Sequence, residues 1–147
     1  MQEIWNLIYE LAVYENAPDE CVITVPQLQE DYKNRHFFAY IATFNDETVG
    51  MALGYQVYST WKGMSMYLED IVVKQNFRRT GIGKLLFEQV ILHAREKKAG
   101  KLVWQVLDWN TPAIEFYKKF NVVFDKEWLT CKLTKEQIEG FYGADHQ

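Results

Sequence analysis

The sequence predicts a mixed α/β fold in which an antiparallel meander of strands is joined to a β-α-β-α-β half. The chain has 147 residues, of which 48% are hydrophobic, enough for one domain with a full core but short of two ordinary domains. Residues 37–73 are rich in aromatic and β-branched side chains, and helical and strand patterns alternate after them. Neither a repeat nor a Pro-, Gly- or Ser-rich linker interrupts the chain. We therefore expect residues 1–147 to form a single domain.

Two helices are expected before the strands. Apolar residues recur with helical spacing between Gln2 and Tyr14, which predicts an amphipathic helix over that span. Thr24 and Gln27, three residues apart, form a capping-box pattern at the start of a second, shorter helix. The apolar positions of the first helix are Ile4, Leu7, Ile8, Leu11 and Ala12.

Three strands are expected next, in antiparallel order. Residues 37–44 and 48–58 have strand composition and are separated by the polar residues 45–47, which is a hairpin signal. A third strand over residues 64–73 follows a turn at residues 59–63, and its length suits the centre of a meander.

The second half of the sequence alternates helical and strand patterns. The expected order is helix 82–98, strand 102–107, helix 112–120 and strand 122–133 with a kink or turn near Asp125. Thr134 with Gln137 caps a last short helix. This order predicts that the meander continues into a strand-helix-strand arrangement of one mixed sheet.

The charge balance favours a small cationic partner. Sixteen Lys and Arg residues against twenty Asp and Glu residues give a net charge of −4, and the isoelectric point is about 5.4. This balance argues against binding to nucleic acid or to an anionic membrane surface. No apolar run approaches the ~18 residues that a membrane span needs.

The start of the chain and its cysteines favour a cytoplasmic protein. The N-terminus lacks the basic start and continuous apolar core of an export signal. Cys21 and Cys131 lie far apart, so we expect reduced, semi-buried side chains. His36, His93 and His146 show no metal-ligand spacing, so we expect no metal site.

Glycines and basic residues gather at the start of the expected helix 82–98. Gly81 and Gly83 let the backbone curl around an anion, and the helix start offers unpaired N–H groups. Arg78, Arg79 and Lys84 add positive charge. On spacing alone, a pyrophosphate site and an ordinary glycine-containing turn explain this segment equally well. The spacing is neither that of a Walker loop nor that of a dinucleotide fingerprint.

The pattern Arg78-x-x-Gly81-x-Gly83 after Ile71-Val72-Val73 resembles the acetyl-CoA pyrophosphate loop of the GNAT superfamily of N-acetyltransferases. Further segments resemble its diamine (spermidine/spermine) acetyltransferase branch, which includes thialysine acetyltransferases. These segments are Leu11-Ala12, Tyr14-Glu15, Tyr67-Leu68-Glu69-Asp70, Trp109-Asn110, Pro112-Ala113-Ile114 and Phe116-Tyr117-Lys118. The resemblance runs from the first helix almost to the C-terminus and implies a GNAT-like fold.

The resemblance implies acetyl-CoA as the cofactor, with no metal and no acyl-enzyme. The pantetheine arm is expected along the third strand, and loop amides are expected to hold the pyrophosphate. The Thr111-Pro112 pair also has ordinary helix-start chemistry, with Thr111 as cap and Pro112 first in the helix. Lys119 also suits a helix C-terminus without any ligand. The implied cofactor residues are Ile71, Val72, Val73, Arg78, Arg79, Thr80, Gly81, Ile82, Gly83, Lys84, Asn110, Ala113, Tyr117 and Lys119.

Tyr117 and Glu69 are the expected catalytic residues. The resemblance implies that Tyr117 protonates the departing CoA thiolate, whereas helical periodicity alone would place this tyrosine in a packed stripe. Glu69 resembles the substrate-binding glutamate and is expected to accept a proton from the amine, directly or through water. Asp70 is expected on the opposite face of the strand because side chains alternate, and a purely structural role for it is equally open.

Four residues are expected to bind a small polyamine, diamine or thialysine-like amine. Tyr14, Glu15 and Glu69 match the branch, while Glu127 resembles a residue contributed across a dimer interface. A solvated helix end is the alternative for Glu15, and a surface loop is the alternative for Glu127. Two other functions stay open, namely acetylation of lysine in a peptide or protein, and a non-catalytic CoA-binding module.

Three departures from the family are visible in the sequence. The family begins with a strand before its first helix, whereas this chain starts almost inside that helix, so we expect the first edge strand to be lacking. The exposed edge, together with the family's habit, suggests a homodimer. Asn121 replaces a frequent glycine and suits a left-handed helix end. The segment of residues 122–128 is shorter than the corresponding segment of polyamine acetyltransferases.

Overall fold

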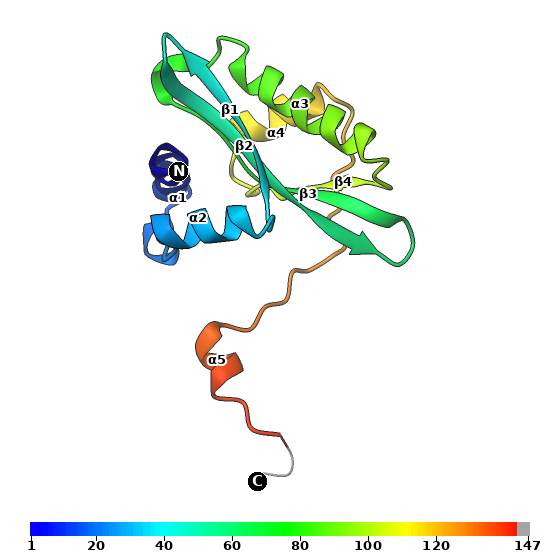
Figure 1. The fold of residues 1–147 in the computed structure, drawn as a ribbon. Coiled ribbons are helices and arrows are strands. Elements are labelled where there is room, and N and C mark those ends of the chain that lie inside the picture. The colour runs from blue at the N-terminus through cyan, green and yellow to red at the C-terminus, as the bar shows by residue number, and fades with distance from the viewer. Residues whose placement is uncertain (144–147) are drawn as a thin grey trace. The chain divides into compact units, whose positions relative to one another are not determined.

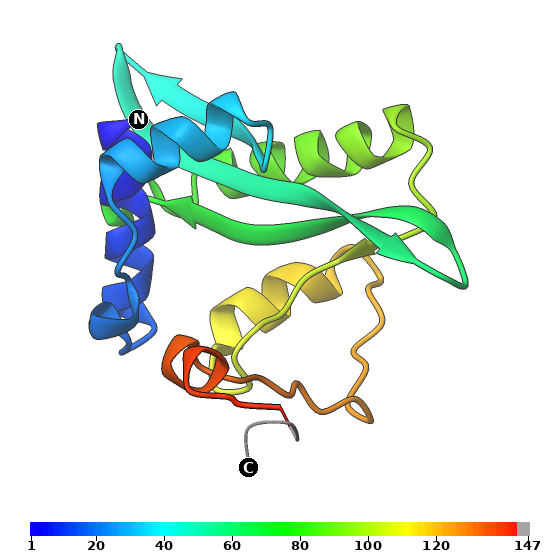
Figure 2. The ribbon, with the colours of Figure 1, turned by 60° about the horizontal axis from the view of Figure 1, so that its bottom comes forward.

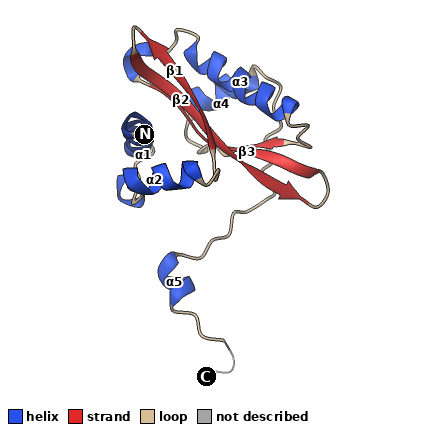
Figure 3. Cartoon of the chain, in the orientation of Figure 1, coloured by secondary structure: helices blue, strands red, loops and turns tan. Residues whose placement is uncertain are grey.

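The computed structural model describes residues 1–143 of the chain and divides it into two compact units. The first unit comprises Met1–Leu107, and the second begins at Asp108. The first unit contains α1 (Gln2–Tyr14), η1 (Pro18–Glu20), α2 (Val25–Lys33), β1 (Phe38–Phe44), β2 (Glu47–Ser59), β3 (Gly63–Val73), η2 (Gln75–Phe77), α3 (Ile82–Glu96) and β4 (Leu102–Val103). The second contains α4 (Thr111–Lys118) and α5 (Lys135–Glu139). Figures 1 and 3 show these elements.

One mixed sheet organises the first unit. Its strand order is β1-β2-β3-β4, with antiparallel pairing of β1 with β2 and of β2 with β3, and parallel pairing of β3 with β4. Asn45 and Asp46 connect β1 to β2 with φ angles of 47° and 63°, as a two-residue hairpin turn with primed geometry requires. The long ribbon of β2 and β3 is clearest in Figure 2. The predicted meander is confirmed.

Helices cover both faces of this sheet (Figure 1). On one face, α1 packs on the strands through a buried cluster. On the other face lies α3, whose Leu86, Phe87 and Val90 are buried. The cluster under α1 consists of Ile4, Leu7, Met51, Leu53 and Val72. Apolar stripes at helical spacing therefore dock α1 and α3 on opposite sides of β2 and β3.

A β-bulge interrupts the pairing of β2 with β3. Leu53 lies opposite Asp70, but the next residue of β2, Gly54, lies opposite Leu68, so Glu69 is an extra residue without a partner. A Cβ atom on Gly54 would meet the carbonyl oxygen of Tyr67 at 2.6 Å and the Phe38 ring at 2.8 Å. Only glycine fits beside the bulge.

Most of the helix-end signals predicted from the sequence are confirmed. Thr24 accepts a hydrogen bond from the Gln27 amide, and a complete capping box joins Thr134 and Gln137. Asn121 adopts the predicted left-handed conformation, with φ of 54°. The predicted cap of α4 was wrong, because Asn110, not Thr111, accepts the Ala113 amide.

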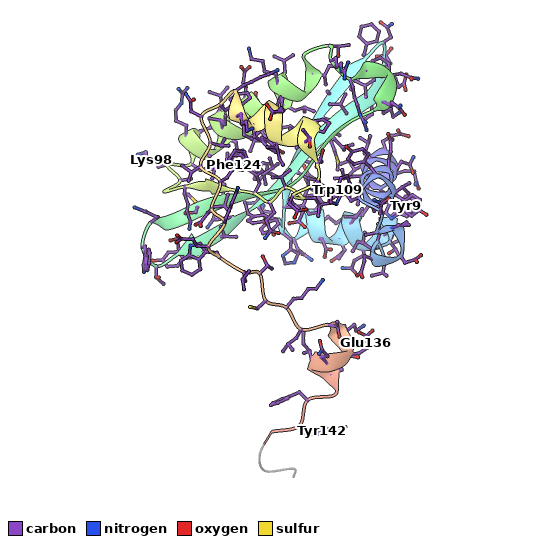
Figure 4. All side chains as sticks on the ribbon, turned by 180° about the vertical axis from the view of Figure 1, so that it is seen from behind. Tyr9, Lys98, Trp109, Phe124, Glu136 and Tyr142 are labelled. Carbon is purple, nitrogen blue, oxygen red and sulfur yellow. The ribbon has the colours of Figure 1, made fainter. Side chains whose placement is uncertain are left out.

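Two strand predictions differ from the structure. The strand expected at residues 102–107 is limited to β4, and the strand expected at residues 122–133 is absent, so that half of the sheet is shorter than predicted. Val123 and Leu129 are 92% and 88% exposed, and in Figure 4 the chain runs as an extended segment from Phe124 towards Glu136. A strand needs a hydrogen-bonded neighbour as well as suitable residues, and no strand pairs with this segment within residues 1–143.

Three smaller expectations concern the start of the chain, the cysteines and membrane spans. α1 begins at Gln2, and β1 forms an edge of the sheet. Cys21 is half-buried as expected, but Cys131 is exposed because it lies in the extended segment, and both are free. Within the described part of the chain, no helix is both long and apolar enough to cross a membrane.

We predict that Gly54→Ala destabilises the protein by about 1–3 kcal/mol, because its methyl group would overlap the Tyr67 carbonyl and force the bulge to shift. Urea unfolding measures this change. Gly83→Ala is the control, because a Cβ atom there meets only Val73 Cγ2 at an ordinary 3.7 Å. The control keeps or gains stability, and equal losses for both variants would contradict this packing argument.

Candidate functional site

A tight loop joins β3 to α3. Arg79 and Gly81 have φ angles of 62° and 90°, and the Thr80 hydroxyl donates a hydrogen bond to the Phe77 carbonyl. The first helical hydrogen bond of α3 runs from the Leu85 amide to the Gly81 carbonyl at 3.1 Å. No side chain of the described residues caps this helix start.

The start of α3 fits a phosphate group. The amides of Ile82, Gly83 and Lys84 precede the first complete turn, so they and the helix dipole favour an anion. Gly83 has room for a Cβ atom, and glycine inside a helix costs about 1 kcal/mol relative to alanine. Packing therefore does not require this glycine, whereas close approach of a ligand would. The residues present fit the pyrophosphate of acetyl-CoA.

Arg78 links the loop to the end of α1. Its Nε donates to the Val73 carbonyl at 3.0 Å, and its guanidinium carbon lies 5.4 Å from the centre of the Tyr14 ring. The second contact is a cation–π interaction. The structure thus brings together one residue expected to bind the cofactor and one expected to bind the substrate.

At the C-terminal end of β3, only one edge of the strand pairs with another described strand. Ile71, Val72 and Val73 pair with β2. On the other side, β4 pairs with β3 only at Met66 and Tyr67, so no described strand continues beside the end of β3. An extended ligand can add to such an edge by main-chain hydrogen bonds, which fits a pantetheine arm.

The bulge places Glu69 and Asp70 on the same face of the sheet. Asp70 lies opposite Leu53, which packs under α1, and residues directly opposite share a face. Tyr55, two residues after Leu53, shares that face, and its hydroxyl donates to Glu69 Oε2 at 2.8 Å. The prediction that Asp70 points to the opposite face was wrong, because the extra residue shifts the alternation by one position.

Glu15 completes an acidic cluster with Glu69 and Asp70. Burial, followed by the charges of Glu69 and Glu15, raises the pKa of Asp70 from 3.8 to about 7. Burial and then the charge of Glu69 raise the pKa of Glu15. The charge of Glu69 thus disfavours ionisation of both Glu15 and Asp70. The end of α1 and the bulge of β3 therefore build one negatively charged site.

Two tyrosines line the same cluster. The rings of Tyr55 and Tyr67 stack with their centres 5.3 Å apart. Burial, followed by the hydrogen bond to Glu69, raises the pKa of Tyr55, and burial raises that of Tyr67. Tyr55 is not among the residues predicted from the sequence, because only the register of β2 against β3 brings it to Glu69. The available signal was its place in a strand neighbouring the Glu69 strand.

The other expected site residues belong to the second unit. The Asn110 side chain accepts the Ala113 amide at 3.4 Å and so shapes the start of α4. Tyr117 on α4 is buried, with its ring 5.4 Å from that of Phe116. Lys119 and Glu127 are exposed. Glu127 lies in the extended segment, and its amide donates to Asp125 at 3.3 Å.

Residues 1–143 contain no group of three or more His, Cys, Asp or Glu side chains placed to hold a metal ion. His36 and His93 lie in this range, and His146 lies outside the described residues. His93 instead meets the Tyr40 hydroxyl at 2.7 Å through Nδ1.

We predict that the stabilising effect of Asp70→Asn grows with pH. The unfolded chain loses the Asp70 proton at about pH 4, and the folded chain only near its raised pKa of about 7, so the folded state loses stability between those values. Relative to wild type, the unfolding free energy of Asp70→Asn should rise by roughly 3 kcal/mol from pH 5 to pH 8, because about two pH units lie between pH 5 and the folded pKa and each contributes about 1.4 kcal/mol.

Urea unfolding at both pH values measures this difference. Asp19→Asn, which removes an exposed carboxylate of the same unit, serves as the control and should show no such change. A pH-independent difference for Asp70→Asn would show that Asp70 is ionised in the folded protein across this range.

Comparisons with known proteins agree with this geometry. The sequence profile of the Acetyltransferase (GNAT) family matches residues 1–121. A thialysine N-epsilon-acetyltransferase of Caenorhabditis elegans is 33% identical over 143 residues, which cover 95% of this chain and 89% of that protein. The corresponding enzyme of Bos taurus is 39% identical over 125 residues, covering 78% and 74%. An aminoglycoside acetyltransferase structure from an uncultured soil metagenomic sample aligns with a TM-score of 0.74 at 20% identity, covering 87% and 85% of the two chains.

The profile match covers most of the chain and includes the bulge, the loop before α3 and α4. The structural alignment shows the same fold and confirms the expected GNAT-like architecture. The chain therefore belongs to the acetyltransferase (GNAT) family, whose members use acetyl-CoA to acetylate amines.

Proposed function

We propose that this enzyme transfers the acetyl group of acetyl-CoA directly to a primary amine of a small polyamine, diamine or thialysine-like molecule. The cluster of Glu15, Glu69 and Asp70 carries the proposal, because three neighbouring carboxylates suit a cationic substrate. The two thialysine N-epsilon-acetyltransferases described above support a thialysine-like amine among these choices. We propose that residues 1–147 act as one catalytic domain.

Bound acetyl-CoA would supply the thioester carbonyl that the amine attacks. The backbone of Ile71–Val73 would pair with the pantetheine arm, and the amides between Arg79 and Lys84 would bind the pyrophosphate. Asn110, Ala113 and Lys119 of the second unit complete the proposed cofactor contacts. Arg78 would act partly by holding Tyr14 and the end of β3 in place.

The amine must lose a proton before it attacks. A free alkylamine resembles lysine, whose pKa is about 10.4, so it arrives as an ammonium ion. Glu69 would accept the proton directly or through water, and the neighbouring Asp70, with its pKa near 7, can take up a proton at neutral pH. Tyr14 and Glu15, with Glu127 as a third contributor, would bind the rest of the substrate.

Tyr117 would protonate the departing CoA thiolate. A phenol has a reference pKa of about 10, so it carries its proton at neutral pH and can donate it. In this step the amine nitrogen bonds to the acetyl carbon, the carbon–sulphur bond breaks, and the proton of Tyr117 goes to sulphur. The nitrogen then loses its second proton to water, and Tyr117 regains a proton from water, which leaves the neutral amide, CoA thiol and the enzyme ready for the next turnover. Its burial on α4 limits competition from water.

The substrate class is tested by thiol release from acetyl-CoA over a panel of amines. We predict release with thialysine or a free diamine or polyamine, and little with a lysine-containing peptide of equal concentration. Release with the peptide alone would assign the enzyme to protein lysine residues instead. CoA binding by calorimetry without release on any amine would contradict the proposed reaction.

We predict that Tyr117→Phe lowers kcat by about 100-fold, a typical contribution of general acid catalysis. The substitution removes only the hydroxyl, so calorimetry should find acetyl-CoA affinity nearly unchanged. Tyr142→Phe, at a 68% exposed tyrosine of the same unit, is the control and should keep its kcat. An unchanged kcat in Tyr117→Phe would remove Tyr117 from the acid role.

The homodimer and the cytoplasmic location expected from the sequence stay predictions. A dimer would match the homodimeric state that the family resemblance implies. It would also offer a partner for the exposed side chains between α4 and α5, such as Trp128 and Leu129, which are 74% and 88% exposed.

A further inference from the structure

Tyr55 contacts the acidic cluster although the proposed reaction gives it no role. Its hydroxyl donates a hydrogen bond of 2.8 Å to Glu69 Oε2. Hydrogen bonds to a charged acceptor are stronger than those between neutral groups. This contact therefore determines where the Glu69 carboxylate lies.

Glu69 needs such a contact because the sheet does not fix its position. It is the extra residue of the bulge, so no residue of β2 lies opposite it. Its side chain is exposed and has several rotatable bonds, so an unrestrained carboxylate would sample many positions. A carboxylate accepts about four hydrogen bonds, so Glu69 held by Tyr55 at one oxygen keeps capacity for an ammonium group.

Tyr55 is itself well placed to hold Glu69. It lies opposite Tyr67 in the ladder, and the two rings stack at an angle of 21°. Burial and the bond to Glu69 raise the pKa of Tyr55, so its hydroxyl stays a donor at physiological pH. A rigid ring on a central strand thus presents a permanent donor to a flexible carboxylate.

We propose that Tyr55 is a positioning residue that holds the Glu69 carboxylate towards the incoming amine. This inference rests on the proposed function, because it gives Tyr55 a part in amine use through Glu69. Tyr55 touches neither the reacting atoms nor the cofactor in this scheme. It acts by reducing the number of positions that Glu69 samples before the substrate binds.

Tyr55→Phe tests the proposal, because it keeps the ring stack and removes the hydroxyl. We expect kcat/KM for the amine to fall roughly tenfold or more, as for loss of a hydrogen bond to a charged group, while KM for acetyl-CoA is unchanged. In the Glu69→Ala background, Tyr55→Phe should cause no further fall. Tyr58→Phe, at a 79% exposed tyrosine of β2, is the matched control and should behave as wild type.

A general structural role would give a different pattern. It would raise KM for acetyl-CoA as well, or lower kcat/KM equally in the wild-type and Glu69→Ala backgrounds, and either result would overturn the proposal. An unchanged kcat/KM in Tyr55→Phe would also overturn it.

A second measurement needs no substrate. Urea unfolding of wild type, Tyr55→Phe, Glu69→Ala and the double variant should show non-additive effects, with a coupling of at least about threefold in the unfolding equilibrium constant. Additive effects would overturn the Tyr55–Glu69 contact. If wild type acetylates none of the amines, the proposed function fails, and this coupling still decides whether Tyr55 holds Glu69.

Discussion

The bulge in β3 determines which side chains face the end of α1. In a regular strand, Glu69 and Asp70 would lie on opposite faces of the sheet, and the sheet would separate their charges. The extra residue instead leaves both carboxylates on the α1 face, where Glu15 joins them. Gly54 permits this, because any larger residue would collide with the Tyr67 carbonyl. The charge of the site therefore depends on one irregularity of the sheet.

The neighbouring carboxylates of the cluster repel one another, and the protein accommodates this repulsion in two ways. Asp70 has a pKa raised to about 7, so it stays protonated below that pH. Tyr55 donates a hydrogen bond to Glu69. A bound ammonium ion would compensate the same charges more fully. The stability cost of the cluster in the free enzyme is thus an expected consequence of the cation binding that we propose.

Arg78 gives the site a physical link to the proposed cofactor loop. The loop needs the left-handed conformations of Arg79 and Gly81 to present the start of α3, and Arg78 ties the same turn to Val73 and Tyr14. Residues expected to bind the cofactor and the amine therefore share one local framework. Movement of this loop would therefore change the contact of Arg78 with Tyr14 at the end of α1.

Local patterns predicted much of this structure. Helical spacing predicted α1, turn residues predicted the β1–β2 hairpin, and Gly81 predicted the turn before α3. Features that depend on pairing were missed, since neither the side of Asp70 nor the contact of Tyr55 follows without the register of β2 against β3. The strand expected at 122–133 failed for the same reason, because strand composition does not supply a neighbouring strand.

The most direct test of the account is a crystal structure of the enzyme with CoA and thialysine. We predict that the reacting amine lies within hydrogen-bond distance, about 3 Å, of the Glu69 carboxylate or of a water bound to it. We also predict that Asp70 and Glu15 face the same molecule and that the pyrophosphate contacts the amides at the start of α3. An amine bound away from Glu69, Asp70 and Glu15 would contradict the central role of the bulge.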